Sequence, residues 1–160
     1  MSSKVHIFTD GACKGNPGKG GYGIVMEWVG NPYKKEFSEG FRLTTNNRME
    51  LLAVIVALEN LKTNDIEVTV FSDSKYVVEA VEKKWVFNWE LKGFKGKKNP
   101  DLWKRFLKVY RDHTVKFMWI KGHNEHPQNE RCDVLAVQAS QKEKLMIDIE
   151  FEKKPEDLFN

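Results

Sequence analysis

Residues 7–23 read IFTDGACKGNPGKGGYG, and this stretch decides between two kinds of fold. Its glycines at positions 18, 20 and 23 match G-x-G-x-x-G, the pattern of dinucleotide-binding loops, in which a helix opens at the glycines and binds the pyrophosphate. Here the glycines run into YGIVMEWV, which has the composition of a strand and no helical stripe of apolar residues. The context therefore argues against a nicotinamide oxidoreductase and predicts two strands joined by tight turns.

The first of these strands is predicted to end at Asp10. Asp10-Gly11 and Asn16-Pro17-Gly18 are turn-forming sequences, so we expect them to connect the two strands. A carboxylate at the end of a strand is held by rigid backbone at the rim of a sheet. Asp10 is therefore a candidate for a functional acid.

The rest of the chain alternates between strand and helix patterns. Segments rich in β-branched and aromatic residues predict strands at 4–9, 20–29, 34–43, 66–71 and 115–120. Apolar residues at helical spacing, with Ser72 or Asp73 and Asn99 as caps, predict helices at 46–62, 74–83, 99–113 and 129–145. This order predicts an α/β fold: a five-stranded mixed sheet, with three antiparallel strands and parallel crossovers, and helices on both faces.

The composition is that of one globular domain. The chain has 160 residues, of which 41% are hydrophobic and 31% charged, enough for one full core and too few for two ordinary domains. We expect the domain to span 1–145, followed by an acidic extension at 146–160 that is mobile or loosely packed. No apolar run has the length of a membrane span or the pattern of a signal peptide, so we expect a cytoplasmic protein with Cys13 and Cys132 reduced.

Basic residues gather in one segment of the chain. Residues 83–108 contain nine Lys or Arg and two acids, so this segment carries +7 in a chain whose net charge is +3. The remainder of the chain is therefore acidic. A basic block of this kind predicts a local surface for a polyanion.

Three further acids, Glu50, Asp73 and Asp133, lie at the ends of predicted elements. Each has an ordinary structural explanation: Glu50 as the acid of a capping box with Asn47, Asp73 as a helix cap, and Asp133 as a first-turn charge near the positive end of its helix. Taken one at a time, these explanations are the more common ones, because acids are frequent in the first turn of helices.

The predicted topology, however, brings these three acids and Asp10 to one end of the sheet. Converging carboxylates raise one another's pKa values unless hard cations neutralise them. Oxygen ligands suit Mg²⁺, and two such ions about 4 Å apart promote in-line displacement at a phosphodiester. A zinc site formed by His126 with Cys13 and Cys132 is a weaker alternative, since the chain lacks a zinc-binding spacing.

Five motifs of this chain resemble, in order, those of type 1 ribonuclease H: DGACKGNPGKGGYG, TTNNRMELLAVIVALE, FSDSKYV, NPDLW and WIKGHNEHPQNERCDVLA. The resemblance covers roughly residues 4–140, and the family's five-stranded mixed sheet agrees with the element order above. It implies hydrolysis of the RNA strand of RNA/DNA hybrids with two Mg²⁺ ions, or Mn²⁺ as a substitute, leaving 5′-phosphate and 3′-hydroxyl ends. It also implies a set of catalytic residues: Asp10, Glu50, Asp73 and Asp133 as metal-binding acids, and His123 as a histidine that carries protons or helps the product depart.

The resemblance further implies contacts to the hybrid. Asn16 and Asn46 would read the RNA 2′-hydroxyl, which is both donor and acceptor, with Cys13 and Asn47 nearby. Turn or helix-cap chemistry explains these asparagines equally well, and one residue can do both. A pocket for a DNA phosphate is implied at Thr45 and Asn99.

The basic block resembles the helical protrusion of the family, here at about residues 83–99. Trp85 and Trp89, one helical turn apart, would form a channel for the DNA strand, and lysines such as Lys97 and Lys98 would bind phosphates. Against this, two Trp on one helix face more often belong to a core.

Two positions depart from the family pattern. Phe94 stands where many members have a third Trp, and Leu43 stands where many have an arginine two residues before Thr45, with Arg42 adjacent. Phosphate anchoring is therefore the implied property with the least support from the residues.

Two other function classes remain to be distinguished. Another nuclease of the same fold, such as a resolvase or transposase core, would share the acids but lack the asparagine and Trp set. A nucleic-acid-binding module without activity would have lost one of the acids, and all four are present. We expect a monomeric enzyme that binds RNA/DNA hybrid and no membrane.

Overall fold

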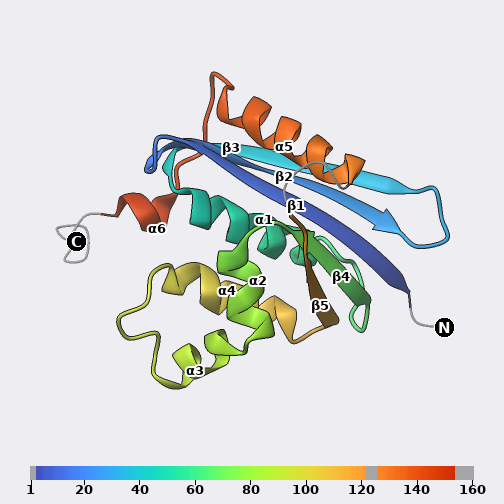
Figure 1. Cartoon of the computed structure of the whole chain (residues 1–160). Helices are drawn as coiled ribbons and strands as arrows, with labels where there is room; N and C mark the ends of the chain where they lie inside the picture. The colour runs from blue at the N-terminus through green and yellow to red at the C-terminus, as the bar shows by residue number, and fades with distance from the viewer. Residues whose placement is uncertain (1–2, 122–125, 154–160) are drawn as a thin grey trace.

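The computed structural model describes residues 3–121 and 126–153, which form a mixed sheet with helices on both faces (Figure 1). Its strands are β1 (Lys4–Lys14), β2 (Gly18–Trp28), β3 (Lys34–Thr44), β4 (Glu67–Ser72) and β5 (Thr114–Trp119), in the order β3-β2-β1-β4-β5. The pairs β1–β2 and β2–β3 are antiparallel, and β1–β4 and β4–β5 are parallel. The predicted five-stranded mixed sheet is confirmed.

In the described part of the chain, six helices connect or cover the strands. They are α1 (Asn46–Glu59), α2 (Lys75–Glu82), α3 (Trp85–Leu91), α4 (Pro100–Tyr110), α5 (Pro127–Ser140) and α6 (Ile149–Glu152). Figure 1 shows α5 alone on one face of the sheet, against β1, β2 and β3, while α1, α2 and α4 lie on the other. No helix among the described residues is long and apolar enough to cross a bilayer.

The core lies between α1 and the sheet. Ile7 of β1, Ile24 of β2 and Leu51 and Ile55 of α1 are completely buried, and Trp103 of α4 closes the core from the other side of α1. Almost every residue of α1 from Arg48 to Leu58 is buried, because the sheet and α4 cover it from two sides. The central helix therefore needs apolar residues around most of its circumference.

The glycine-rich stretch is mostly strand, which corrects the prediction that Asp10-Gly11 forms a turn. Asp10 and Gly11 lie inside β1 and pair with Gly23 and Tyr22 of β2, and only residues 15–17 form the turn. A Cβ on Gly11 would lie 2.6 Å from the backbone nitrogen of Glu50, and one on Gly23 would meet the carbonyl oxygen of Cys132. These glycines therefore let α1 and α5 pack against opposite faces of the hairpin more closely than any side chain would permit.

The segment after α5 packs on the domain, which corrects the prediction of a loosely packed extension for residues 146–153. Met146 continues the sheet beside Phe41, with N–H···O bonds of 2.8 and 3.0 Å to Gly40 and from Arg42. Asp148 is buried and accepts a 2.7 Å hydrogen bond from the Thr44 hydroxyl. The packed part of this segment extends through α6 to Lys153. Residues 154–160 lie outside the described part of the chain.

Candidate active site

Three acids from distant parts of the sequence converge beside the centre of the sheet. One ligand oxygen from each of Asp10, Glu50 and Asp73 lies within 4.8 Å of the other two. They line a hollow of about 480 Å³, whose walls also include Asp133, Asn46, Asn47 and Lys75. The structure thus brings three of the four predicted acids into one cluster and places the fourth on the wall of the same hollow.

The position of Asp10 follows from the unequal lengths of the strands. The parallel ladder between β1 and β4 ends at Phe8 and Phe71, whereas β1 continues to Lys14 along β2. Up to Phe8, β1 lies between β2 and β4, whereas at Asp10 it pairs with β2 and no longer with β4. Its Oδ1 accepts a 3.0 Å hydrogen bond from the Gly11 N–H, and the residue is almost fully buried.

Glu50 and Asp73 are placed by helices whose caps are other residues. Thr45 caps α1 and accepts from the Arg48 N–H at 3.2 Å, so the predicted capping box of Asn47 with Glu50 is wrong, and Glu50 lies beyond the first turn. Ser74 caps α2, so the prediction of Ser72 or Asp73 as that cap is also wrong. Both acids are thereby available for the hollow.

Asp133 reaches the hollow from the opposite face of the sheet. Because α5 begins at Pro127, Asp133 is the seventh residue of the helix, which corrects its predicted place in the first turn. The close approach of α5 at Gly23 brings this part of the helix toward β1. The charge is consequently too far along α5 to be explained by the helix dipole.

The metal-free cluster opposes ionisation of Glu50. Burial raises the pKa of the Glu50 carboxyl well above its usual value, and the nearby charges of Asp10 and Asp73 raise it further, while the Gly11 N–H acts in the opposite direction. Oε2 of Glu50 is buried and finds no hydrogen-bond partner among the described residues. A buried, unsatisfied carboxylate oxygen beside two further acids fits the ligand preference of a hard divalent cation.

The predicted histidine and the zinc alternative have different outcomes. His123 lies outside the described residues. His126 packs its ring against Phe8 and Phe71, with ring centres 5.9 and 5.5 Å apart, and Cys132 donates to the Phe8 carbonyl at 3.2 Å. Within 3–121 and 126–153, the group of Asp10, Glu50 and Asp73 is the only one suited to a metal, so His126 and the cysteines form no zinc site there.

Asn46 lines the hollow, and Asn16 and Cys13 make hydrogen bonds near the start of α1. Asn16 Oδ1 accepts from the Asn46 N–H at 3.0 Å, which ties the β1–β2 turn to the start of α1. The Cys13 thiol donates to the carbonyls of Gly15 and Thr44 at 3.0 and 3.4 Å, and burial raises its pKa. Asn16 thus has a structural role, and its side-chain NH₂ group is still available for other contacts.

A second hollow of about 600 Å³ adjoins the first, since Asn47 lines both. Its other walls include four of the residues predicted to bind the hybrid or its phosphates: Asn16, Thr45, Lys98 and Asn99. Asn99 precedes α4 as predicted, but its side chain makes no capping bond. Instead its Oδ1 accepts from Arg48 at 3.1 Å and its Nδ2 donates to the Tyr76 hydroxyl at 3.0 Å.

Arg48 also lines the second hollow, and the sequence analysis assigned it no role. It is buried and donates to both oxygens of Asp101, at 3.0 and 2.7 Å, and to both oxygens of Asp148, at 2.7 and 2.9 Å. Its partners lie 53 and 100 residues away in the chain, so no local pattern could have linked them. The network holds Asn99 and the C-terminal segment in place.

A third hollow, of about 280 Å³, lies on the basic protrusion between Trp85 and Trp89. Lys97 lies over the Trp89 ring at 5.1 Å, and Lys83 over the Trp85 ring at the same distance. Trp85 is 43% exposed, whereas Trp89 is partly buried against Trp103. Each explanation of the Trp pair therefore holds for one ring: Trp85 is a surface residue, and Trp89 also belongs to the core.

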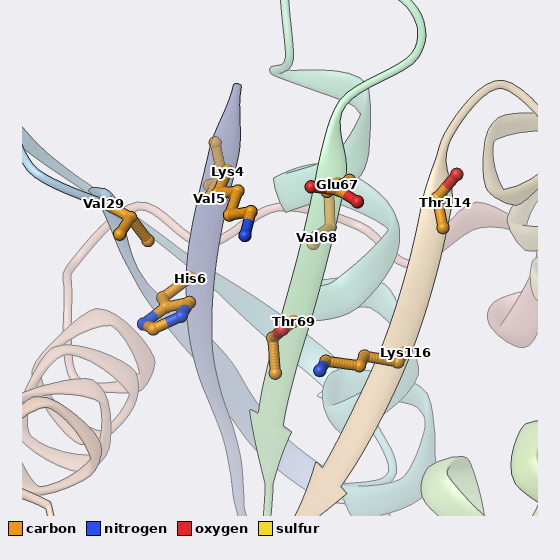
Figure 2. A pocket seen from close by; sticks show the side chains of 9 residues that line it. All are labelled: Lys4, Val5, His6, Val29, Glu67, Val68, Thr69, Thr114 and Lys116. Carbon is orange, nitrogen blue, oxygen red and sulfur yellow. The ribbon is translucent and has the colours of Figure 1, made fainter. Parts of the chain in front are cut away.

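One more hollow lies at the opposite end of the parallel strands (Figure 2). It has a volume of about 410 Å³ and is lined by the beginnings of β1, β4 and β5, including Lys4, His6, Thr69 and Lys116. Glu67 is the one acid among its lining residues. It therefore lacks the clustered carboxylates of the first hollow.

Comparison with known proteins agrees with this geometry. Residues 2–141 match the family model of RNase H. A ribonuclease H of Desulforamulus reducens is 53% identical over 151 residues, covering 91% of this chain and 93% of that relative, and one of an Enterobacter species is 51% identical over 141 residues, covering 85% and 88%.

Solved structures show the same similarity. LC9-RNase H1, a type 1 RNase H with the type 2 active-site motif, matches with a TM-score of 0.80 and 28% identity over 99% of this chain and 85% of its own. LC11-RNase H1, solved in complex with RNA/DNA hybrid, matches with a TM-score of 0.63 and 30% identity over 84% of this chain and 95% of its own. From the sheet order, the acid cluster and these matches together, we conclude that this chain belongs to the ribonuclease H family, as a type 1 enzyme.

Proposed function

We propose that this chain hydrolyses the RNA strand of RNA/DNA hybrids with two divalent cations, Mg²⁺ or in its place Mn²⁺, and leaves 5′-phosphate and 3′-hydroxyl ends. The observation that carries the proposal is the cluster of Asp10, Glu50 and Asp73, whose ligand oxygens lie within 4.8 Å of one another in one hollow of about 480 Å³. The match to LC11-RNase H1, a protein solved with a hybrid, supports the substrate class.

Asp10, Glu50 and Asp73 would hold the cations, and Asp133 would complete the set. When bound, the two ions would lower the pKa of the attacking water and stabilise the charge that develops on the leaving oxygen. The strand, the helix and the β4–α2 junction that carry the three clustered acids fix their spacing before substrate arrives. The resemblance implies that His123 carries protons. His123→Ala should therefore slow turnover without abolishing it.

The neighbouring hollows would together contact both strands of the duplex. In the first and second hollows, Asn16, Asn46 and Asn47 offer amide groups that can both donate to and accept from a 2′-hydroxyl. Thr45, Lys98 and Asn99 in the second hollow would bind a phosphate of the DNA strand, and the Trp85 and Lys97 surface would contact that strand farther along.

A duplex with one chimeric strand tests the proposal directly. One strand is DNA, and its partner is RNA in one half and DNA in the other; the duplex is incubated with Mg²⁺ and, in parallel, with EDTA. We expect cuts confined to the RNA half that disappear with EDTA, and ligation or phosphatase treatment would verify the 5′-phosphate ends. Cuts in both halves would instead indicate another nuclease of the same fold, and no cutting with Mg²⁺ or Mn²⁺ would indicate a binding module.

A further inference from the structure

Trp119 is an exposed aromatic residue beside the acid cluster for which the proposed chemistry assigns no role. It is the last residue of β5 and pairs in register with Ser72, the last residue of β4. Trp119 is 43% exposed, although burying a large aromatic ring away from water is favourable. Its position next to Asp73 suggests that the ring is kept at the surface for a reason other than core packing.

Two contacts join this ring to the wall of the first hollow. Trp119 Nε1 donates a 3.2 Å hydrogen bond to the backbone carbonyl of Asp73. The Lys75 ammonium lies 5.2 Å from the ring centre, within the range of a cation–π interaction, and Lys75 itself lines the hollow. The indole N–H thus binds the backbone of Asp73, and the face of the ring attracts the ammonium group of Lys75.

The backbone at Asp73 has particular need of such a contact. The parallel ladder with β5 reaches Ser72, where the Ile120 N–H donates to the Ser72 carbonyl at 3.0 Å, and α2 begins at Lys75. Asp73 therefore lies between a strand and a helix, outside both regular hydrogen-bond ladders. A displacement of the Asp73 backbone would move its carboxylate relative to Asp10 and Glu50, because the side chain is attached to the Cα of the same residue.

We propose that Trp119 is a positioning residue that holds the Asp73 carboxylate in register with Asp10 and Glu50 for cation binding. The Nε1–H bond fixes the Asp73 carbonyl from the side of β5, and the ring keeps the Lys75 ammonium at the rim of the hollow. This proposal rests on the proposed function, since it concerns the same acid cluster. The role assigned to Trp119 is transmitted through Asp73 and requires no contact between Trp119 and the substrate or the cations.

The experiment measures Mn²⁺ binding to the protein without substrate, by calorimetry and by loss of the free Mn²⁺ signal in electron paramagnetic resonance. Trp119→Phe keeps an aromatic ring over which Lys75 can lie and removes the N–H. Replacing Trp119 by its benzothiophene isostere keeps the whole ring system and removes only the N–H. The matched control is Trp28→Phe, the same change in β2, at the end of the sheet where Trp28 contacts Tyr33.

We expect both changes at Trp119 to weaken Mn²⁺ binding threefold to tenfold, while Trp28→Phe leaves it unchanged. The cleavage rate of Trp119→Phe should be reduced at low Mg²⁺ and recover at saturating Mg²⁺, with the KM for hybrid unchanged. Thermal unfolding in EDTA checks that the variants are folded.

Wild-type affinity for Mn²⁺ in both Trp119 variants would overturn the proposal, as would an equal loss in Trp28→Phe. If the wild-type protein itself bound no Mn²⁺, the proposed metal site would fail first. The two failures are therefore distinguishable by the wild-type titration alone.

Discussion

At the scale of single residues, the surroundings of Glu50 oppose the ionisation of its carboxyl group. Its pKa is raised by burial and by Asp10 and Asp73, so the folded state binds this proton more tightly than the unfolded chain does. Stability then decreases as pH rises from about the usual value of 4.5 through the raised pKa. A neutral residue at this position removes the penalty.

We therefore expect Glu50→Gln to stabilise the protein without bound cations at pH 7, because the variant neither buries a charge beside Asp10 and Asp73 nor takes up a proton on folding. Each unit by which the fold raises the Glu50 pKa corresponds to about 1.4 kcal/mol. Urea unfolding in EDTA at pH 4 and pH 7 measures this, and the gain should be much smaller at pH 4. Mg²⁺ should stabilise the wild-type protein more than the variant. A variant less stable than wild type at pH 7 in EDTA would show that the charge is better compensated than the structure indicates.

Asp10 gives a second prediction at this scale. Asp10→Asn keeps the size and the Gly11 contact but removes a charge from the centre of the cluster. Cleavage should fall at least a thousandfold, about 4 kcal/mol of transition-state stabilisation, while hybrid binding in EDTA persists. Turnover near the wild-type rate would exclude the cluster as the catalytic centre.

At the scale of elements, α3 and the lysines that flank it form the surface whose function the sequence described least completely. Trp85 is exposed, and Trp89 contacts both Lys97 and the buried Trp103. The two Trp residues therefore differ in what a substitution removes.

Trp85→Ala should weaken hybrid binding about tenfold, in line with base or sugar stacking on an aromatic ring, and leave the midpoint of thermal unfolding nearly unchanged. Trp89→Ala should weaken binding and also lower the free energy of unfolding by about 2 kcal/mol, because it removes part of the core. Fluorescence anisotropy with a labelled hybrid and urea unfolding separate the two effects. Equal losses of stability in both variants would mean that Trp85 is also a core residue.

The sheet and the four longest helices were predictable because hydrophobic periodicity reports which face of an element is buried. Two features were not. From the sequence, the glycines of 7–23 were interpreted as turn formers. Their actual role at Gly11 is the close approach of the α1 backbone, a tertiary contact that no local pattern reveals. Periodicity also did not predict α3 and α6, because elements of seven and four residues are too short to show a period. The helical protrusion at about 83–99 was implied by the family resemblance alone.

The acid cluster was predictable only in part for the same reason. The convergence of Asp10, Asp73 and Glu50 was predicted from strand and helix ends, and the structure places their oxygens together. Asp10, however, lies inside β1, and Glu50 lies beyond the first turn of α1. The caps at Thr45 and Ser74 were missed, because neighbouring residues of the same chemical type competed for each prediction. His123 and the contacts to the hybrid stay predictions.

At the scale of the whole molecule, Arg48 joins the central helix to α4 and to the C-terminal segment. The guanidinium is buried between Asp101 and Asp148, which lie on two different elements. Removing one partner leaves part of a buried charge without compensation.

Asp148→Asn should therefore lower the free energy of unfolding by about 3 kcal/mol and loosen the segment that follows Met146. Hydrogen exchange should report faster exchange at Met146 and Arg42, whose N–H groups bond across this junction. The matched control is Glu152→Gln, which breaks the exposed pair with Arg42 and should leave stability nearly unchanged. No difference between the two variants would mean that Asp101 alone balances Arg48.

The glycine contacts also have a consequence for the newly made protein. The acids come from β1, α1, the β4–α2 junction and α5, and Gly11 and Gly23 admit the two helices from opposite sides of one hairpin. A chain growing on the ribosome therefore displays its first acid early, but it cannot complete the set until α5 has emerged and settled over Gly23. During translation the nascent polypeptide would therefore not cleave nearby nucleic acid, and activity would begin only when α5 packs against the hairpin.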